Sequence, residues 1–284
     1  MDFGMPTLIE NRSLEENISL CKELGLQFVE LNMNFPMYQI QQLEQTERLK
    51  KLADENKIYF TIHLDENLNI CDFNSLVADA YLETVERALN AAHEIGAPLL
   101  NMHMNHGIYI TLPDRKVRLF KEYREEYLAA IRKFREVCEE AAGDFDGKIC
   151  IENTDGYLDF ETEAIEELLQ SRLFALTWDI GHSHTCDNVD EAFLMKHRDR
   201  LYHFHIHDGL GNKNHQTLGT GEIDLEQRLG IAGACGCRCV VETKTIEALR
   251  KSVEWLKING YKMRADAIGL PYLFNNIGRE LISP

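Results

Sequence analysis

The sequence lacks any apolar run long enough to cross a membrane, and it lacks low-complexity stretches and long runs of charge. A transmembrane helix needs about 20 apolar residues in a row, so the chain is not expected to span a bilayer. With 44% hydrophobic residues, it can bury a sizeable core. Residues 1–6 show no basic region followed by an apolar one, which argues against a secretory signal. We therefore expect a soluble, cytoplasmic protein.

Positive charge is scarce, with 30 Lys and Arg residues against 47 Asp and Glu residues and a formal net charge of −17. This balance argues against a large phosphate-neutralising surface, and hence against nucleic acid as a partner, although it is compatible with a local basic patch. The eight cysteines are scattered along the chain. Without a secretory signal, they are expected to be reduced thiols rather than a disulfide framework.

What the sequence does contain is one repeated unit, a short apolar strand followed by a loop and an amphipathic helix. Helices are expected over residues 13–24, 39–56, 75–95, 113–142, 160–170, 189–197, 225–234 and 246–259. Strands are expected over residues 2–7, 27–31, 58–63, 97–103, 148–152, 173–179, 202–208 and 238–242. Eight such units with no linker between them predict parallel strands that close into a single α/β domain, a (β/α)8 TIM barrel over residues 1–260.

The remaining segment, residues 261–284, contains the apolar sequence Leu270-Pro-Tyr-Leu-Phe274. We expect this C-terminal extension to pack on the barrel or on a partner subunit. Together with the exposed helices of a barrel, it would allow a homo-oligomer.

The seventh expected strand alternates apolar and polar residues as Tyr202-His-Phe-His-Ile-His-Asp208. Its three histidines, His203, His205 and His207, therefore point to the same face. Stacked imidazoles are unfavourable to bury unless they hold a proton, a hydrogen-bond partner or a metal ion. A hydrogen-bonded core position explains any one of them, but the cluster and the residues upstream favour a functional site.

Strand ends carry the strongest indication of function. Because the carboxyl ends of all barrel strands meet at one mouth, side chains at these ends converge there. From the third strand onward, nearly every end has a side chain that can bind a metal ion: His63, His103, Glu152, Asp179, His205 and Glu242. Mixed imidazole and carboxylate ligands suit Zn, Mn, Co or Fe(II) better than Ca. The sequence thus predicts a divalent metal site at the mouth, with Zn, Mn, Co and Mg all open as the cofactor.

These segments resemble the xylose-isomerase-like barrels, a family that includes sugar and sugar-phosphate isomerases and epimerases as well as endonuclease IV. The resemblance runs from the third strand to the eighth, and it is carried by the order and number of short motifs. These motifs are Ile62-His63-Leu64, Met102-His103-Met104, Ile151-Glu152-Asn153-Thr154, Trp178-Asp179-Ile180-Gly181-His182, Phe204-His205-Ile206-His207-Asp208, His215-Gln-Thr-Leu-Gly-Thr-Gly221 and Val241-Glu242-Thr243.

The resemblance implies a metal-dependent isomerase or epimerase that acts on a small sugar or sugar phosphate. Glu152, Asp179, His205 and Glu242 would hold a single catalytic metal ion. The ion would bind adjacent oxygens of a hydroxy-carbonyl sugar and stabilise an enediolate, with Glu152 and Glu242 as the catalytic base and acid. His182 would bind a substrate hydroxyl.

The same family implies an alternative, zinc-dependent phosphodiester cleavage of the endonuclease IV type, as in an AP endonuclease. That subfamily uses three zinc ions, and His63, His103, His182 and His215 occupy the places of its additional ligands. Its third zinc also needs an aspartate two residues before the loop histidine. That position is Lys213 here, and an ammonium group cannot bind a cation.

Three further possibilities remain open from the sequence. Lys213 and His207 are candidate substrate-binding residues; Lys213 could contact an anionic substrate group in place of an arginine of some ketose epimerases, whose position is Gly211 here. Gly219-Thr-Gly221 could cradle a phosphate, although a tight turn explains the two glycines equally well. A barrel of this kind could also bind a metal ion or a sugar without catalysis, because a fold does not determine activity.

Overall fold

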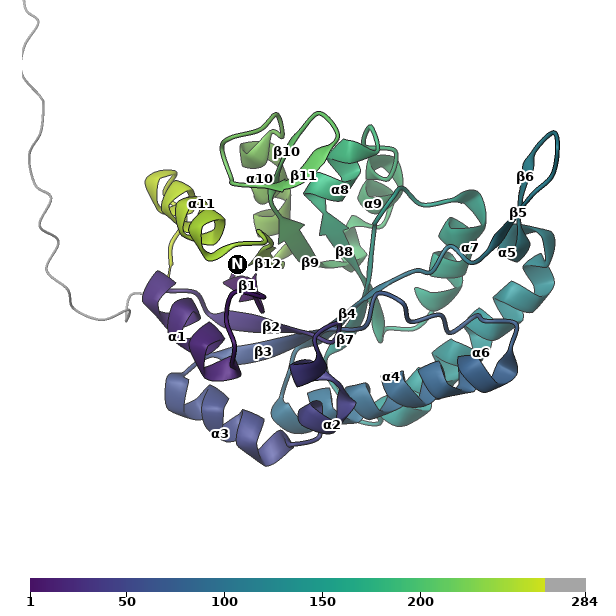
Figure 1. Cartoon of the computed structure of the whole chain (residues 1–284), viewed down its shortest axis with the longest axis horizontal. Helices are drawn as coiled ribbons and strands as arrows, with labels where there is room; N and C mark the ends of the chain where they lie inside the picture. Colours follow the sequence, from purple (N-terminus) through teal and green to yellow (C-terminus); the bar gives the residue numbers. More distant parts are fainter. Residues whose placement is uncertain (264–284) are drawn as a thin grey trace, which may run out of the picture.

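A computed structural model of the chain describes residues 1–263. Eight parallel strands form a closed barrel at the centre of the molecule, with the helices outside it (Figure 1). This confirms the predicted single (β/α)8 TIM barrel. In barrel order the strands are β1 (Phe3–Pro6), β12 (Arg238–Val241), β9 (Leu201–Ile206), β8 (Phe174–Asp179), β7 (Lys148–Glu152), β4 (Leu99–His103), β3 (Tyr59–His63) and β2 (Phe28–Asn32).

The barrel strands are buried on both faces. Successive side chains along a strand alternate between the outer side of the barrel and its interior. On β8, Trp178 packs on the outer side against Phe204 of β9, with ring centroids 5.6 Å apart. The inner positions are polar, and the Thr177 hydroxyl donates a hydrogen bond to the side-chain oxygen of Asn101 at 2.5 Å. Buried polar groups of this kind persist only when they are hydrogen-bonded. The barrel interior is therefore an ordered polar layer beneath the mouth.

The main outer helices have the amphipathic character expected of elements that cover a sheet. Some of them begin at a residue whose side chain caps the helix. Ser13 is an example, because its hydroxyl accepts a hydrogen bond from the Glu16 N–H at 3.2 Å. In chain order they are α1 (Leu14–Leu24), α3 (Thr46–Asn56), α4 (Ser75–Ile95), α6 (Arg124–Ala142), α7 (Asp159–Leu168), α9 (Glu191–Lys196), α10 (Leu225–Cys235) and α11 (Ile246–Ile258).

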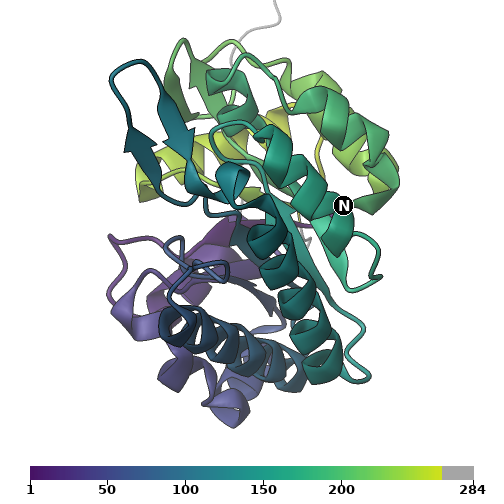
Figure 2. The same cartoon turned by 90° about the vertical axis from the view of Figure 1, so that its right-hand side faces the viewer.

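Two predicted helices were wrong in their extent. The segment 39–56 is interrupted, with a short helix α2 (Ile40–Leu43) after the 3-10 turn at Pro36–Tyr38 and before α3. The predicted helix over 113–142 begins as an antiparallel hairpin of β5 (Tyr109–Thr111) and β6 (Lys116–Arg118). The sequence Pro113-Asp114 favours a turn. After α5 (Leu119–Glu122), the helix proper is α6; Figure 2 shows the hairpin projecting from the body of the molecule.

The histidine strand is also shorter than predicted. It ends at Ile206, and a second hairpin follows, formed by β10 (Asp208–Leu210) and β11 (Lys213–Gln216). A short helix α8 (Ile180–Thr185), which the sequence analysis did not predict, follows β8 directly. Both additions lie at the carboxyl ends of barrel strands, so they build the mouth rather than the barrel.

None of the eight cysteines, all of which lie within residues 1–263, forms a disulfide. Across residues 1–263, no helix combines the length and the apolar character that crossing a bilayer requires.

The start of the predicted C-terminal extension packs on the barrel. The ring of Tyr261 lies against Phe3 and Trp255, with centroids 6.0 and 6.4 Å apart. Residues 264–284 lie outside the described part of the chain, so the role of the extension stays a prediction.

Candidate metal centre

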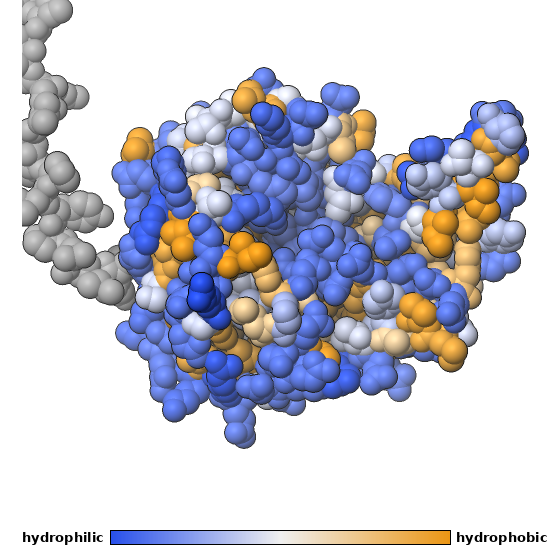
Figure 3. All heavy atoms as spheres, in the orientation of Figure 1, coloured by the Kyte–Doolittle hydropathy of each residue, from blue (hydrophilic) through white to orange (hydrophobic). Residues whose placement is uncertain are grey.

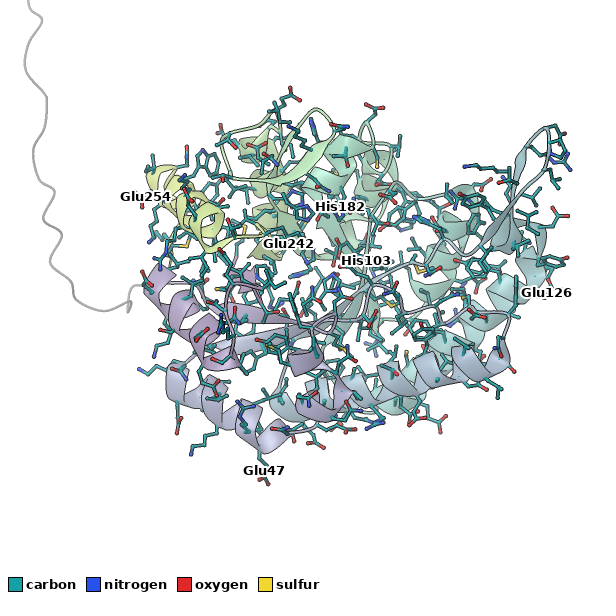
Figure 4. The ribbon with its side chains drawn as sticks, viewed as in Figure 1. Glu47, His103, Glu126, His182, Glu242 and Glu254 are labelled. Carbon is teal, nitrogen blue, oxygen red and sulfur yellow. The ribbon has the colours of Figure 1, made fainter. Side chains whose placement is uncertain are left out.

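Four strands bring one metal-competent side chain each to the mouth of the barrel. Glu152 ends β7, Asp179 ends β8, His205 lies in β9, and Glu242 follows β12. All four are buried, and one ligand atom from each lies within 4.8 Å of the others. Figure 4 shows Glu242, His182 and His103 gathered at the centre of the molecule. The structure thus brings together the four residues that the sequence predicted as metal ligands.

The chemistry of this cluster fits a divalent cation. Nδ1 of His205 lies 3.0 Å from Oε2 of Glu242 and 3.3 Å from Oε1 of Glu152. Neither Nδ1 of His205 nor Oε2 of Glu242 makes a hydrogen bond of good geometry, although both atoms are buried. Buried polar atoms without a partner are rare in proteins. A cation between one imidazole and three carboxylates would satisfy both atoms, and this donor set suits Zn, Mn or Co.

Glu30, on β2, is a residue of this site that the sequence analysis missed. Its Oε1 lies 3.0 Å from Nε2 of His205, and its Oε2 lies 3.0 Å from Nε2 of His203. The Thr61 hydroxyl donates a further hydrogen bond to Oε2 at 2.9 Å. An ionised carboxylate can only accept, so Nε2 of His205 carries the proton and its Nδ1 is turned toward the other carboxylates. A glutamate inside an apolar strand, Phe28-Val-Glu-Leu31, was the pattern that could have revealed it.

Opposite charges in the cluster hold one another in the ionised form. Burial, the largest single effect, would raise the pKa of the Glu152 and Glu242 carboxyls, but His205 acts together with His103 at Glu152 and with Lys244 at Glu242, and holds both pKa values well below the ordinary range. Burial would likewise lower the pKa of His205, but Glu152, Glu242 and Glu30 together outweigh it and hold that pKa well above its usual value. The carboxylates are therefore ionised, and in the metal-free protein the imidazolium supplies the positive charge that a cation would bring.

The four additional histidines all surround the quartet. Nε2 of His63 and of His103 lie 3.4 and 3.1 Å from Oε2 of Glu152. On the other side, Nδ1 of His182 lies 3.5 Å from Oε1 of Glu152, and Nε2 of His215 lies 3.8 Å from Oε1 of Glu242. His63 also forms a compact group with Glu152 and His205, whose ligand atoms lie within 4.8 Å of one another. The mouth therefore holds more ligand groups than one ion requires.

His207 occupies a different position from the one expected of a substrate-binding residue. It is fully buried, its Nε2 lies 3.0 Å from Oδ1 of Asp179, and its Nδ1 accepts a hydrogen bond from the His215 N–H at 2.8 Å. Because both nitrogens are engaged, the geometry argues against substrate contact and for orientation of Asp179. Gly181 makes room for this ring, since a Cβ there would lie 1.8 Å from Cε1 of His207.

Two lysines lie near the mouth, and only one contacts the quartet. Lys213 is exposed on β11, and no carboxylate of residues 1–263 pairs with it. Lys244 places Nζ 2.8 Å from Oε1 of Glu242, and its side chain is 58% exposed. The sequence analysis did not single out Lys244, because a lysine two residues after a strand is common in surface loops.

The predicted phosphate cradle is a tight turn held by one carboxylate. The backbone N–H groups of Gly219 and Gly221 donate hydrogen bonds to Oδ2 of Asp208 at 3.0 and 2.8 Å. The N–H of Ile223 donates to Oδ1 of the same side chain at 3.2 Å. These donors are already paired, so they do not face a ligand. The turn interpretation of the two glycines is the one that agrees with the structure.

A family model described as the xylose isomerase-like TIM barrel matches residues 18–259, and the chain belongs to this family. Two uncharacterized proteins of Methanocaldococcus jannaschii are each 26% identical to it. One aligns over 222 residues, which are 74% of this chain and 72% of the relative. The other aligns over 182 residues, which are 62% of this chain and 66% of the relative.

Solved structures with the same fold include three that are described as epimerases or epimerase-like. A D-tagatose 3-epimerase-like protein has a TM-score of 0.74 and 24% identity, with 91% of this chain and 96% of that chain covered. The 3-keto-D-glucoside 4-epimerase of E. coli has a TM-score of 0.71 and 18% identity, with 91% and 99% covered. D-psicose 3-epimerase of Clostridium cellulolyticum has a TM-score of 0.69 and 14% identity, with 93% and 99% covered. At these identities the likeness establishes the fold.

Proposed function

We propose that the protein is a divalent-metal-dependent isomerase or epimerase of a sugar or sugar derivative. The observation that carries the proposal is the buried quartet of Glu152, Asp179, His205 and Glu242, whose ligand atoms converge within 4.8 Å. Two of its members are glutamates that also suit proton transfer. The structurally similar proteins are described as a D-tagatose 3-epimerase-like protein, a 3-keto-D-glucoside 4-epimerase and a D-psicose 3-epimerase, and these names support a carbonyl sugar as the substrate class.

All four residues of the quartet would hold the cation, and its two glutamates would also transfer protons. A cation held by them would bind neighbouring oxygens of a hydroxy-carbonyl sugar and stabilise the negative charge that develops as a C–H proton leaves. Glu152 comes from β7 and Glu242 from the end of β12, so the two carboxylates approach the mouth from different walls of the barrel. One would remove the proton, and the other would return a proton to the neighbouring carbon or to the opposite face.

Lys244 is the cation that we assign to substrate binding, in place of Lys213. Its ammonium group lies beside Oε1 of Glu242 and is open to solvent at the mouth. A lysine there can donate hydrogen bonds to a substrate oxygen while it keeps the adjacent glutamate ionised. Lys213 has no comparable contact with the quartet, although it lies two residues from His215.

Zinc-dependent phosphodiester cleavage is the second candidate. The additional histidines favour it, because His63, His103, His182 and His215 all surround the quartet at the places where extra metal ligands would lie. Lys213 argues against a complete three-metal site, since its position calls for a carboxylate. The net charge of −17 also argues against an extended DNA-binding surface.

The test combines metal content with turnover. Elemental analysis of protein purified without chelator is expected to give one tightly bound ion per chain, and a panel of ketoses and aldoses is expected to reveal isomerisation or epimerisation. Glu152→Gln and Glu242→Gln should each lower turnover by roughly 10²–10⁴-fold, because each removes a proton-transfer group. Glu47→Gln changes an exposed glutamate on α3 in the same way and should leave turnover unchanged.

The outcomes separate the candidates. Turnover that persists after complete removal of the metal would contradict the proposal. Two or three zinc ions per chain, lost in His103→Ala and His182→Ala, would favour the phosphodiesterase and direct the assay to abasic-site DNA. A bound ion without turnover on either substrate class would leave a binding protein.

A further inference from the structure

His106 and Glu161 form a histidine–carboxylate pair that the proposed function leaves without a role. His106 lies in the loop after β4, and Glu161 lies in the first turn of α7. Nδ1 of His106 is 2.5 Å from Oε1 of Glu161, whose side chain is fully buried. The N–H of Leu158 donates a hydrogen bond to Oε2 of Glu161 at 2.8 Å. Both carboxyl oxygens of Glu161 therefore accept hydrogen bonds, and Nδ1 of His106 is the donor to one of them.

The loop that carries His106 is held on both sides of this residue. The side-chain oxygen of Asn105 accepts a hydrogen bond from the N–H of Gly107 at 2.9 Å. Gly107 has a φ of +66°, and a Cβ at this position would lie 2.6 Å from the ring of Phe120. Together with the contact to Glu161, these features restrict the orientation of the imidazole. Nε2 is the ring nitrogen of His106 that is left for a ligand.

Nε2 of His106 lies beside a second carboxylate, Asp155, in the loop after β7. Nε2 is 4.0 Å from Oδ2 of Asp155, which is too long for a direct hydrogen bond, and the Asp155 side chain is 89% exposed. The hydrogen bond to Glu161 raises the pKa of His106, and Asp155 acts in the same direction. The form with a proton on both ring nitrogens is thereby favoured, so a donor and an acceptor lie side by side. A hydroxyl group can accept from the imidazole and donate to the carboxylate at the same time.

His106 and Asp155 lie directly beyond the candidate metal centre. His103 and Glu152 are partners in the register of β4 and β7, and Nε2 of His103 lies 3.1 Å from Oε2 of Glu152. His106 and Asp155 each follow one of these residues by three positions, and three residues of chain span at most about 11 Å. Figure 4 places His103 near the centre of the view, and Figure 3 shows hydrophilic side chains around the hollow there. A sugar whose reacting carbons lie at the cation therefore has its far end within reach of His106 and Asp155.

We propose that His106 and Asp155 together bind a hydroxyl group of the substrate, at the end of the sugar remote from the metal ion. This inference rests on the proposed isomerase or epimerase function. Nε2–H of His106 donates a hydrogen bond to the hydroxyl oxygen, and the hydroxyl donates to Asp155. Glu161 does not touch the substrate. It is a positioning residue, because it orients the His106 ring and keeps Nε2 as a donor.

The charges around His106 favour a hydroxyl group over a phosphate. Glu161 and Asp155 raise the pKa of His106, and the Arg118 guanidinium lowers it. Two negative and two positive groups leave no excess of positive charge with which to bind a phosphate dianion. The backbone donors of the turn at residues 219–221 are already paired with Asp208. The far end of the substrate is therefore expected to be unphosphorylated.

Matched substrates test the two residues. A ketohexose that the wild type converts is compared with its 5-deoxy and 6-deoxy analogues and with its 6-phosphate. The wild type is expected to convert the ketohexose with about 10–100-fold higher kcat/KM than at least one deoxy analogue, because the buried donor and acceptor lose their partner. In His106→Ala and in Asp155→Ala, this preference should disappear, and the KM for the ketohexose should rise while kcat changes little.

Two further variants separate positioning from a general structural effect. Glu161→Gln should reduce the preference for the ketohexose several-fold, whereas a merely structural defect would lower kcat/KM equally for every substrate. Asp199→Ala removes an exposed carboxylate just before β9, at the opposite end of the barrel, and should keep the full preference. Because the Asp155 side chain is exposed, Asp155→Ala is expected to fold even if His106→Ala does not, and circular dichroism verifies this.

The results distinguish this inference from the proposed function. A wild type that converts no sugar would contradict the proposed function, and the inference with it. If the ketohexose is converted, three results would overturn the inference alone. These are a wild type that does not discriminate against either deoxy analogue, an unchanged preference in both His106→Ala and Asp155→Ala, and a higher kcat/KM for the 6-phosphate than for the free sugar.

Discussion

At the residue scale, the contact between Glu30 and His205 determines which nitrogen faces the candidate metal position. The Nε2–H group of His205 is held by Glu30 at 3.0 Å, so Nδ1 is the atom that binds a cation once it has lost its proton. His203 shares the same carboxylate, and it lies one layer deeper in the barrel. The imidazole is thereby oriented before any ligand arrives.

Removal of the Glu30 carboxylate should weaken metal binding, although Glu30 is not one of the proposed metal ligands. We expect Glu30→Gln to lower the affinity for manganese by roughly 10–100-fold, because the amide no longer holds the Nε2–H tautomer and the orientation of His205. Isothermal titration calorimetry on the metal-free protein measures the change. Glu161→Gln is the matched control, since Glu161 is also fully buried and bonded to a histidine, His106. Equal affinities of Glu30→Gln and the wild type would contradict this role.

At the element scale, the loop between β11 and α10 is organised by a single side chain. Asp208 accepts hydrogen bonds from the N–H groups of Gly209, Gly219, Gly221 and Ile223. Gly221 has to be glycine, because a Cβ there would lie 2.1 Å from the carbonyl oxygen of Gly209. The loop adjoins the hairpin that carries His215, so its order supports one wall of the mouth.

We expect Asp208→Asn to destabilise the protein by about 1–3 kcal/mol, because the amide NH2 group faces backbone donors that then lack an acceptor. Urea denaturation measures the free energy of unfolding, and hydrogen exchange at residues 217–223 should speed up. Asp224→Asn is the control, since Asp224 caps α10 and asparagine caps a helix equally well. A loop that stays protected in Asp208→Asn would show that its backbone is ordered by other contacts.

The same scale explains which elements the sequence predicted and which it did not. All eight barrel strands were predicted because each is a short apolar run between turn residues, buried on both faces. Strand β6 was mistaken for helix because Lys, Arg and Val are compatible with both structures, and only the turn at Pro113-Asp114 distinguishes them. Helix α8 was missed because its six residues are too few to display helical periodicity.

At the scale of the whole molecule, metal binding, protonation and stability are linked. In the metal-free protein, burial lowers the pKa of His63 and His182, but the nearby carboxylates raise it by more. The pKa of His63 is therefore raised to about 9 and that of His182 to about 10. The pKa of His205 is raised as well. These rings are protonated at neutral pH, and a metal-bound nitrogen must lose its proton. Protons therefore compete with the cation, and the competition weakens as the pH rises.

We expect added manganese to raise the melting temperature, because an ion that binds only the folded state stabilises it by about 2.7 kcal/mol at 100 times its Kd. The increase should be larger at pH 8 than at pH 6, since fewer protons compete at the higher pH. Thermal unfolding followed by circular dichroism, with and without the ion, measures both effects. Glu242→Gln removes a proposed ligand and should abolish most of the increase. An increase independent of pH would contradict the competition.

The sequence by itself determined the barrel, the family and the four candidate ligands. Parallel strands have their carboxyl ends at one edge, so residues that end successive strands converge whatever their separation along the chain. Glu152, Asp179, His205 and Glu242 were predictable for that reason, and the structure places them within 4.8 Å.

Only the tertiary structure decided which side chains meet across the barrel interior. Glu30 and His205 come from strands that are not neighbours in the barrel, and their contact depends on strand stagger, which sequence periodicity does not encode. Lys244 meets Glu242 through a loop conformation. His207 contacts Asp179 from just beyond the end of β9, which lies two residues earlier than the alternation predicted. Local patterns specify elements, whereas these contacts depend on how the elements pack.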